Sequence, residues 1–134
     1  MRISIGTNKE ISNYQNMSID DFIEKVESSE ATHIYAPTIL NKIRFEKHPE
    51  FINILHSKLR LGGELQIGGL DGFEVSREVL VQTIKLSELS KMIIDEHIVS
   101  FPSTADIKEL LVNSGFKIST CKLNGPFFLW NATK

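Results

Sequence analysis

The sequence predicts an α/β domain with a mostly parallel sheet and an antiparallel strand pair at its C-terminal edge. Short β-branched runs alternate along the chain with segments whose apolar residues recur at helical spacing. The last two β-prone runs are separated only by the turn residues Asn124-Gly125-Pro126, which is typical of a hairpin. Since 41% of the 134 residues are hydrophobic, we expect residues 1–134 to form a single domain with its own core.

The first half of the chain is predicted to contain three short strands and one short helix. These are strands Arg2 to Ile5, Tyr14 to Ile19 and Thr32 to Ala36, and a helix from Asp20 to Glu27. The first strand ends in the turn Gly6-Thr7-Asn8, and Ser18 is the expected N-cap of the helix. Pro37 ends the third strand because it lacks a backbone donor and holds the preceding residue in an extended conformation.

The second half has longer helical patterns. The expected elements are a helix from Pro49 to the glycine pair Gly62-Gly63, strand Glu64 to Ile67, helices Glu74 to Met92 and Ser103 to Ser114, and strands Phe116 to Leu123 and Phe127 to Ala132. Glycine is common just after the last residue of a helix, so the glycine pair is interpreted as a helix end. The amphipathic segment Glu74 to Met92 is interpreted either as a lid over a site or as an oligomerisation surface, which leaves a homo-oligomer open.

Composition excludes several classes of function. The formal charge is −2 and no run of basic residues occurs, which disfavours nucleic acid and anionic membranes as partners. Cys121 is the only cysteine, and the four histidines show no metal-ligand spacing, so no metal site is predicted. No apolar run approaches the roughly 20 residues that a membrane span needs. A soluble cytoplasmic protein is therefore expected.

Candidate site residues fall where the predicted parallel strands end. In open α/β sheets, ligands bind outside the carboxyl ends of the strands. Those ends are Gly6 to Asn8, Ser18, Ala36 with Pro37, and Gly68 to Asp71. The glycine pair Gly68-Gly69 permits close approach of a backbone, either to a ligand or within a turn. Asp71 brings a carboxylate to this rim, as a turn or cap residue or as a base.

The order of these segments resembles a known family. The stretches that carry the resemblance are RISIG, YQNMSI, THIYAPTIL, LRLGGELQI, ADIKELLVNSGFKI and the closing hairpin. Together they resemble the class I S-adenosylmethionine-dependent methyltransferases, particularly the short type found in surface-polysaccharide biosynthesis. The resemblance spans nearly the whole chain. It implies a single Rossmann-like domain with a shortened N-terminal half and S-adenosylmethionine as the cofactor.

The resemblance also implies roles for particular residues. Gly6, Thr7 and Ser18 would contact the cofactor, with Ala36 and Pro37 forming a wall of its site. Asp71 would be the catalytic base or would position the substrate. The sequence departs from the family at two of these places. Only Gly6 remains of the glycine-rich loop, and Ser18 stands where the family has the acidic residue that binds the ribose hydroxyls.

Two hypotheses of function follow. The first is a divergent methyltransferase that acts on a small-molecule or saccharide acceptor. This chemistry needs no fixed triad, because the cofactor already carries a good leaving group. The second is a methyltransferase-like domain without catalytic activity, which uses an exposed sheet edge or the aromatic hairpin to bind or assemble with a partner. The shortened glycine loop favours the second hypothesis, and the strand-end site favours the first.

Overall fold

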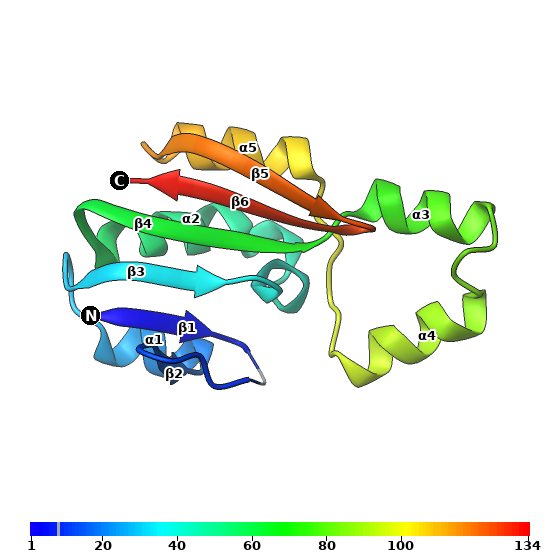
Figure 1. Ribbon diagram of the computed structural model, residues 1–134, viewed down its shortest axis with the longest axis horizontal. Coiled ribbons are helices and arrows are strands. Elements are labelled where there is room, and N and C mark those ends of the chain that lie inside the picture. The colour runs from blue at the N-terminus through cyan, green and yellow to red at the C-terminus, as the bar shows by residue number, and fades with distance from the viewer. Residues whose placement is uncertain (8) are drawn as a thin grey trace.

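The computed structural model describes residues 1–7 and 9–134, so Asn8 in the expected turn after the first strand lies outside the described residues. The elements in chain order are β1 (Arg2–Ile5), β2 (Gln15–Met17), α1 (Ile19–Lys25), β3 (Ala31–Ala36), the 3-10 turns η1 (Ile39–Lys42) and η2 (Phe45–Lys47), α2 (His48–Lys58), β4 (Leu59–Leu70), α3 (Gly72–Leu80), α4 (Leu86–Asp95), α5 (Thr104–Asn113), β5 (Lys117–Asn124) and β6 (Phe127–Thr133). Figure 1 shows the sheet beside a projecting pair of helices, α3 and α4.

The sheet has the predicted topology. Its strand order is β2-β1-β3-β4-β6-β5. The first four strands pair in parallel, while β6 pairs antiparallel with both β4 and β5. The hairpin between β5 and β6 turns at Gly125, whose φ of 59° lies in the left-handed region that glycine adopts without a steric penalty. The mostly parallel α/β fold with a C-terminal antiparallel hairpin is therefore confirmed.

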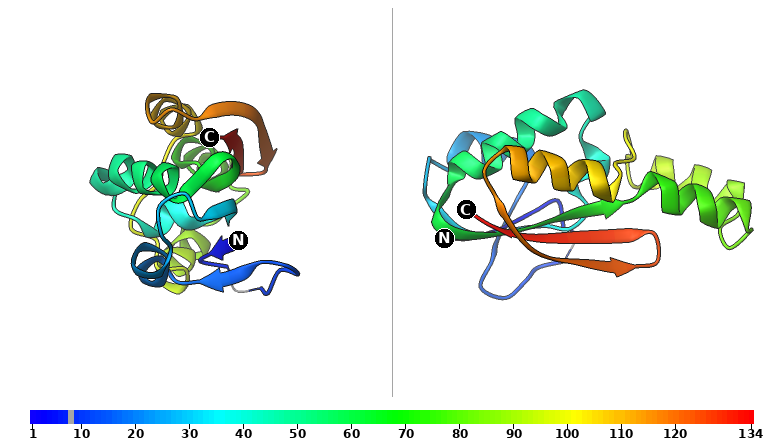
Figure 2. Two further views of the ribbon diagram at one scale, coloured as in Figure 1. Left: turned by 90° about the vertical axis from the view of Figure 1, so that its left-hand side faces the viewer. Right: turned by 90° about the horizontal axis from the view of Figure 1, so that it is seen from above.

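One face of the sheet carries the core. Helices α1, α2 and α5 cover this face, and Figure 2 shows no helix on the opposite face among the described residues. The strand positions that face these helices form an apolar row across the sheet in register, namely Ile3, Ile34, Leu65 and Ala132. All four are at most 2% exposed. Burying such a row on one side is the main favourable contribution to folding.

The opposite face is polar. The next row in register runs Asn16, Ser4, Tyr35, Gln66, Asn131 and Thr120. Hydrogen bonds link neighbours in this row: the Gln66 amide donates to the Asn131 side-chain oxygen at 2.8 Å, and the Asn131 amide donates to the Thr120 hydroxyl at 2.8 Å. Parallel sheets are normally covered on both faces and read as continuous apolar runs. Here the alternation of apolar and polar residues explains why helices are needed on one face only.

The N-terminal half is short because β1 passes to β2 without a helix in the residues that the structure describes between Gly6 and Tyr14. The expected second strand is reduced to Gln15–Met17. The Ser18 hydroxyl accepts a hydrogen bond from the Asp21 amide at 3.1 Å, which confirms Ser18 as the N-cap of α1. The chain therefore reaches β3 with a single helix.

Two expected helices are wrong in extent. The helix before the glycine pair ends at Lys58, and β4 begins at Leu59 and runs through Gly62 and Gly63. The Gly62 amide donates to the carbonyl of Lys134, and the Lys134 amide donates to the carbonyl of Gly63, so the C-terminal residue holds this stretch extended. The glycine pair lies within a long strand, where the pairing with β3 shifts register between Leu59 and Glu64 and Gly62 has a φ of 81°.

The expected helix Glu74 to Met92 is two helices, α3 and α4. The break lies at residues 81–85, where Gln82 has a φ of 61°. The Glu78 carbonyl accepts hydrogen bonds from the amides of both Thr83 and Ile84, which turns the chain back on itself. The pair has a small core of its own, formed by Leu70, Val75, Ile98 and adjoining half-buried side chains. This core fixes the projecting helices at the end of β4.

Candidate functional site

The carboxyl ends of β1 and β3 lie side by side because these strands pair in parallel. After β1, Gly6 has a φ of 69°, and its amide donates to the Met17 carbonyl at 3.4 Å. The Thr7 hydroxyl lies 3.3 Å from the side-chain oxygen of Asn16, while the Asn16 amide donates to the Thr7 carbonyl at 3.2 Å. These contacts fix the first residues beyond β1 against β2.

A cavity of about 360 Å³ opens at these strand ends. Gly6 and Thr7 line it from the end of β1, Pro37 and Thr38 line it after β3, and Glu96 lines it from the end of α4. Its volume falls within the roughly 300–1,000 Å³ typical of small-molecule sites. The structure thus brings together three of the predicted cofactor residues, Gly6, Thr7 and Pro37.

A second cavity of about 650 Å³ adjoins the first and shares Lys9, Thr38, Lys42 and Glu96 with it. Its other walls are mostly apolar and come from β4, the α4 region and the start of β6: Leu70, Met92, Ile98 and Phe127. The two cavities therefore meet at charged side chains. One cavity faces the ends of the parallel strands, and the other faces the projecting helices.

The remaining predicted cofactor residues lie apart from these cavities. Ala36 is fully buried in the core, one residue before Pro37. Ser18 is not among the residues that line either cavity, and its hydroxyl caps α1. Of the five predicted cofactor residues, the geometry leaves Gly6, Thr7 and Pro37 in reach of a ligand in the first cavity.

Asp71 lies at a different position, where it joins two helices. Its Oδ1 accepts from the amides of Phe73 at 2.8 Å and Glu74 at 3.1 Å, which caps α3. Its Oδ2 accepts from the amide of Thr104 at 2.7 Å and from the Thr104 hydroxyl at 2.6 Å, at the first residue of α5. Asp71 does not line the two cavities described above. It lines a separate one of about 400 Å³ beside the hairpin turn.

The charge of Asp71 is stabilised by these bonds. Burial raises the pKa of the carboxyl, but the hydrogen bonds from Thr104, Glu74 and Phe73 lower it more, so the pKa lies below its ordinary value. A carboxylate with four donors and a lowered pKa is a weak proton acceptor at neutral pH. The geometry therefore suits a side chain that fixes α3 and α5 rather than a general base.

The glycine pair Gly68-Gly69 approaches other parts of the chain. Both residues lie inside β4 and pair with Leu129 and Phe128 of β6. A Cβ at Gly68 would come within 2.0 Å of the Phe128 carbonyl oxygen, and one at Gly69 within 2.6 Å of the Asn41 side-chain oxygen. The close approach that the sequence indicated is thus between strands and turns of this protein, and it leaves these glycines no space to receive a ligand.

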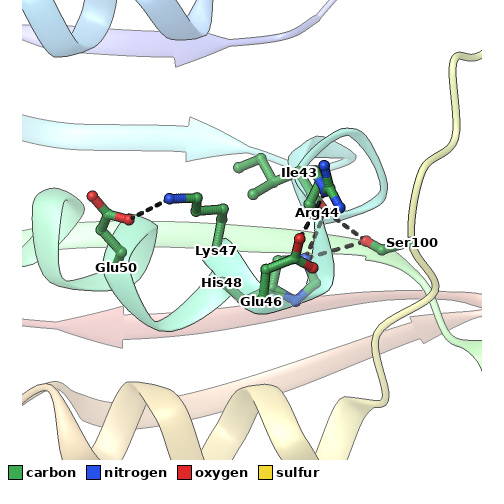
Figure 3. Close-up of polar contacts among 7 residues, drawn as sticks. All are labelled: Ile43, Arg44, Glu46, Lys47, His48, Glu50 and Ser100. Atoms are coloured by element: carbon green, nitrogen blue, oxygen red, sulfur yellow. Dashed lines mark hydrogen bonds and ion pairs between the residues drawn. The ribbon is translucent and has the colours of Figure 1, made fainter.

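A buried polar cluster holds η1 in place beneath the cavities. The Nε2 atom of His48 lies 2.9 Å from the Leu40 carbonyl oxygen and 3.0 Å from that of Ile43, so this nitrogen carries a proton and donates. The Ser100 hydroxyl lies 2.9 Å and 2.7 Å from the same two oxygens. Figure 3 shows Ser100 joined to both Ile43 and His48, with the Ser100 hydroxyl 3.2 Å from the His48 Nε2 atom. Residues far apart in the sequence are thereby tied together.

Replacing Ser100 by alanine tests this cluster. The change leaves two buried carbonyl groups with His48 as their remaining side-chain donor, so we expect a loss of about 1–2 kcal/mol in the free energy of unfolding. Urea denaturation measures it. Ser119→Ala is the matched control, because that hydroxyl is exposed and bonds to the Asn131 carbonyl; its effect should stay within about 0.5 kcal/mol. Equal losses in the two variants would contradict the structural role of Ser100.

Sequence reasoning missed Glu96 and assigned no role to Lys42. Lys42 ends η1, six residues beyond β3, and its Nζ lies 3.4 Å from the Gly6 carbonyl oxygen. The position of Lys42 shortly after the end of a predicted strand could have been noticed in the sequence. Glu96 reaches the site only because α4 folds back across the sheet end, and no local signal indicates that contact.

Three further observations concern metal ligands, the cysteine and membrane spans. Among the described residues, no group of three or more His, Cys, Asp or Glu side chains is arranged to hold a metal ion. Burial raises the pKa of the Cys121 thiol, although a backbone hydrogen bond to Leu129 lowers it, so the reactive thiolate is disfavoured. No helix in the described part of the chain is long and apolar enough to cross a membrane.

Comparison with known proteins addresses the fold. Neither protein-family models nor curated proteins give a match. Solved structures do. An S-adenosylmethionine-dependent methyltransferase from Mesorhizobium loti is 10% identical with a TM-score of 0.60, and the match covers 94% of this chain and 72% of that one. A methyltransferase of the same class from Archaeoglobus fulgidus is 14% identical with a TM-score of 0.60, covering 91% and 67%.

A third similar structure is magnesium protoporphyrin IX methyltransferase from Synechocystis PCC 6803 with bound S-adenosylhomocysteine. It is 12% identical with a TM-score of 0.62, and the match covers 90% of this chain but 51% of that one. The chain thus spans between half and three quarters of these proteins. It has a class I S-adenosylmethionine-dependent methyltransferase-like fold, as the sequence resemblance implied.

Proposed function

We propose that this protein is a divergent S-adenosylmethionine-dependent methyltransferase that acts on a small-molecule or saccharide acceptor, with its cofactor in the cavity at the ends of β1 and β3. One observation carries the proposal. Gly6, Thr7 and Pro37 come from the carboxyl ends of two adjacent parallel strands and line one cavity, in a methyltransferase-like fold. This is where open α/β sheets bind their ligands.

The residues present are compatible with the cofactor. Gly6 and Thr7 would present backbone to its methionine portion, and Pro37 with Thr38 would form a wall beside it. Glu96 is the carboxylate that lines this cavity in the described part of the chain. It would take the place of the acidic residue that the second strand lacks, because a carboxylate accepts hydrogen bonds from ribose hydroxyls.

The protein's own contribution to the reaction would be alignment and exclusion of water. Held by Gly6, Thr7 and Pro37, S-adenosylmethionine would supply a methyl group: a lone pair of the acceptor would form the bond to the methyl carbon as the carbon–sulfur bond breaks, with its electron pair left on sulfur. We propose that Asp71 positions α3 and α5. Because α4 packs beside α3, Asp71 would also position the cavity wall that α4 provides. The acceptor's proton would pass to water at the mouth of the cavities.

A second candidate is a binding or assembly module without catalytic activity. The observation that favours it is the polar sheet face, which carries no helix in the described part of the chain. Parallel sheets are seldom left uncovered. Under this hypothesis a partner would cover that face, and the cavity at the strand ends would bind no cofactor.

Calorimetric titration with S-adenosylhomocysteine separates the two candidates. We expect saturable binding to the unmodified protein. Glu96→Gln should weaken it about ten- to hundred-fold, because a hydrogen bond to a charged group contributes about 1.5–3 kcal/mol. Glu88→Gln is the matched control, since Glu88 is an exposed residue of the same helix that does not line the cavity.

The outcomes are distinct. Binding that Glu96→Gln weakens and Glu88→Gln leaves unchanged supports a cofactor in the first cavity. Binding that both variants retain in full would place the cofactor elsewhere. No heat of binding and no thermal stabilisation of the unmodified protein would overturn the methyltransferase proposal and favour the binding module.

A further inference from the structure

We infer that the second cavity receives an acceptor with an apolar body and a single anionic group, a carboxylate or a phosphate, which Lys42 and Lys9 hold. The inference rests on the proposed function, because the ligand is a methyl acceptor only if the protein is a methyltransferase. The combination of an apolar cavity and cationic side chains at its junction with the first cavity carries the argument.

The apolar part of the cavity is built from distant segments. Leu70 ends β4, Met92 lies in α4, Ile98 follows α4, and Phe127 begins β6. Leu70 and Ile98 are buried in the small core beneath the projecting helices, whereas Phe127 is 43% exposed. The walls therefore rest on fixed residues. Removing an apolar ligand surface from water against them is favourable by roughly 25 cal/mol per Å².

The charged part has an excess of positive charge. Lys9, Lys42 and Glu96 line the junction of the cavities, so two ammonium groups face one carboxylate. Within the described part of the chain, no carboxylate lies within 4 Å of either lysine's Nζ. The contact of Lys42 with the Gly6 carbonyl is long, at 3.4 Å, and uses one of three donors. An anion would be the natural partner of the remaining donors.

Lys42 is also held in position. It ends η1, whose preceding residues Ile39, Leu40 and Asn41 are buried. The Asn41 side chain donates to the carbonyls of Leu70 and Ser100 and accepts from the Leu70 amide at 2.7 Å. These bonds use both N–H donors of the Asn41 side chain, so Lys42 is the donor that remains for a ligand. A half-buried ammonium on a fixed turn has less entropy to lose on binding than one on a mobile loop.

The test uses 2-naphthoate as the probe, with the neutral 2-naphthamide as its isostere and 2-naphthyl phosphate as the second anion. We expect the naphthoate to bind at least tenfold more tightly than the amide, as measured by fluorescence titration. Lys42→Gln should weaken naphthoate binding about five- to tenfold and leave the amide unchanged, while Lys42→Arg should retain most of the affinity. A comparison of the two anions tells a carboxylate acceptor from a phosphate one.

Two further variants test the role of charge and provide a control. Glu96→Gln removes the opposing charge and should tighten naphthoate binding about two- to fivefold, the reverse of its effect on S-adenosylhomocysteine. Lys91→Gln is the control, because Lys91 is an exposed residue of α4 that does not line the cavity. Equal affinity for naphthoate and naphthamide, or full naphthoate affinity in Lys42→Gln with a normal thermal melt, would overturn the inference.

The same titrations distinguish this inference from the proposed function. If S-adenosylhomocysteine binds and naphthoate does not, the anion site is wrong while the cofactor proposal stands. If naphthoate binds through Lys42 and S-adenosylhomocysteine does not bind at all, the anion site stands as a ligand site and the methyltransferase proposal fails.

Discussion

Gly68→Ala is expected to destabilise the protein by more than about 3 kcal/mol or to prevent folding. The new methyl group would lie 2.0 Å from the Phe128 carbonyl oxygen and 3.0 Å from that of Pro37. Both neighbours are backbone atoms, so neither can rotate away. The central pairing of β4 with β6 would have to shift, and overpacking of this kind commonly costs 1–3 kcal/mol or more even where side chains can adjust. Since small domains have only about 5–15 kcal/mol of stability, this is a large fraction.

Gly62→Ala is the matched control in the same strand. Apart from its own chain neighbours, no described residue has an atom within 4 Å of a Cβ at Gly62, so the cost comes from its φ of 81°. We expect a loss of about 1 kcal/mol, the usual cost of a non-glycine residue in the left-handed region. Urea denaturation followed by circular dichroism measures both variants. A Gly68→Ala protein as stable as Gly62→Ala would show that β4 and β6 are not packed as described.

Asp71→Ala should cost about 3 kcal/mol in the free energy of unfolding. The change removes four hydrogen bonds, two that cap α3 and two from Thr104 of α5. Loss of one N-cap side chain costs about 0.5–2 kcal/mol, and buried donors left without an acceptor add to it. Asp71→Asn keeps the shape but places an amide donor where an acceptor is needed, so an intermediate loss is expected.

The contribution of Asp71 should also depend on pH. Because its pKa in the folded protein lies below the ordinary value of 3.8, the folded state favours the charged form. The stabilisation is then complete above the unfolded pKa and is lost as the pH falls from about 4 through the folded pKa. The difference in stability between the unmodified protein and Asp71→Asn should shrink over that window. A difference that is the same at pH 7 and pH 3 would contradict the role of the charge.

Much of the fold follows from local pattern. The strands near Arg2 and Thr32 and the closing hairpin were visible because β-branched runs end at Gly6, Pro37 and Gly125. The helix starts at Ser18 and Ser103 were visible because a serine hydroxyl that accepts from the third amide along is a local interaction. Sequence alone was sufficient wherever the deciding contact was close along the chain.

Sequence analysis failed where contacts between residues far apart along the chain determine the structure. The glycine pair Gly62-Gly63 has the composition of a helix end, but bonds to Lys134 make it part of a strand. Asp71 is a cap residue, one of the roles that the sequence suggested, but its second partner, Thr104, lies 33 residues further along and was not foreseen. Glu96 enters the site through the fold of α3 and α4. None of these contacts leaves a periodic or compositional trace in the sequence.

The proposed function requires a cofactor at the ends of β1 and β3. A titration of the isotopically labelled protein with S-adenosylhomocysteine, followed through backbone amide chemical shifts, tests this requirement first. We expect saturable shifts that centre on Gly6, Thr7, Thr38 and Glu96, with the polar sheet face around Gln66 and Asn131 unchanged. Shifts confined to that sheet face, or no shifts at saturating ligand, would contradict it.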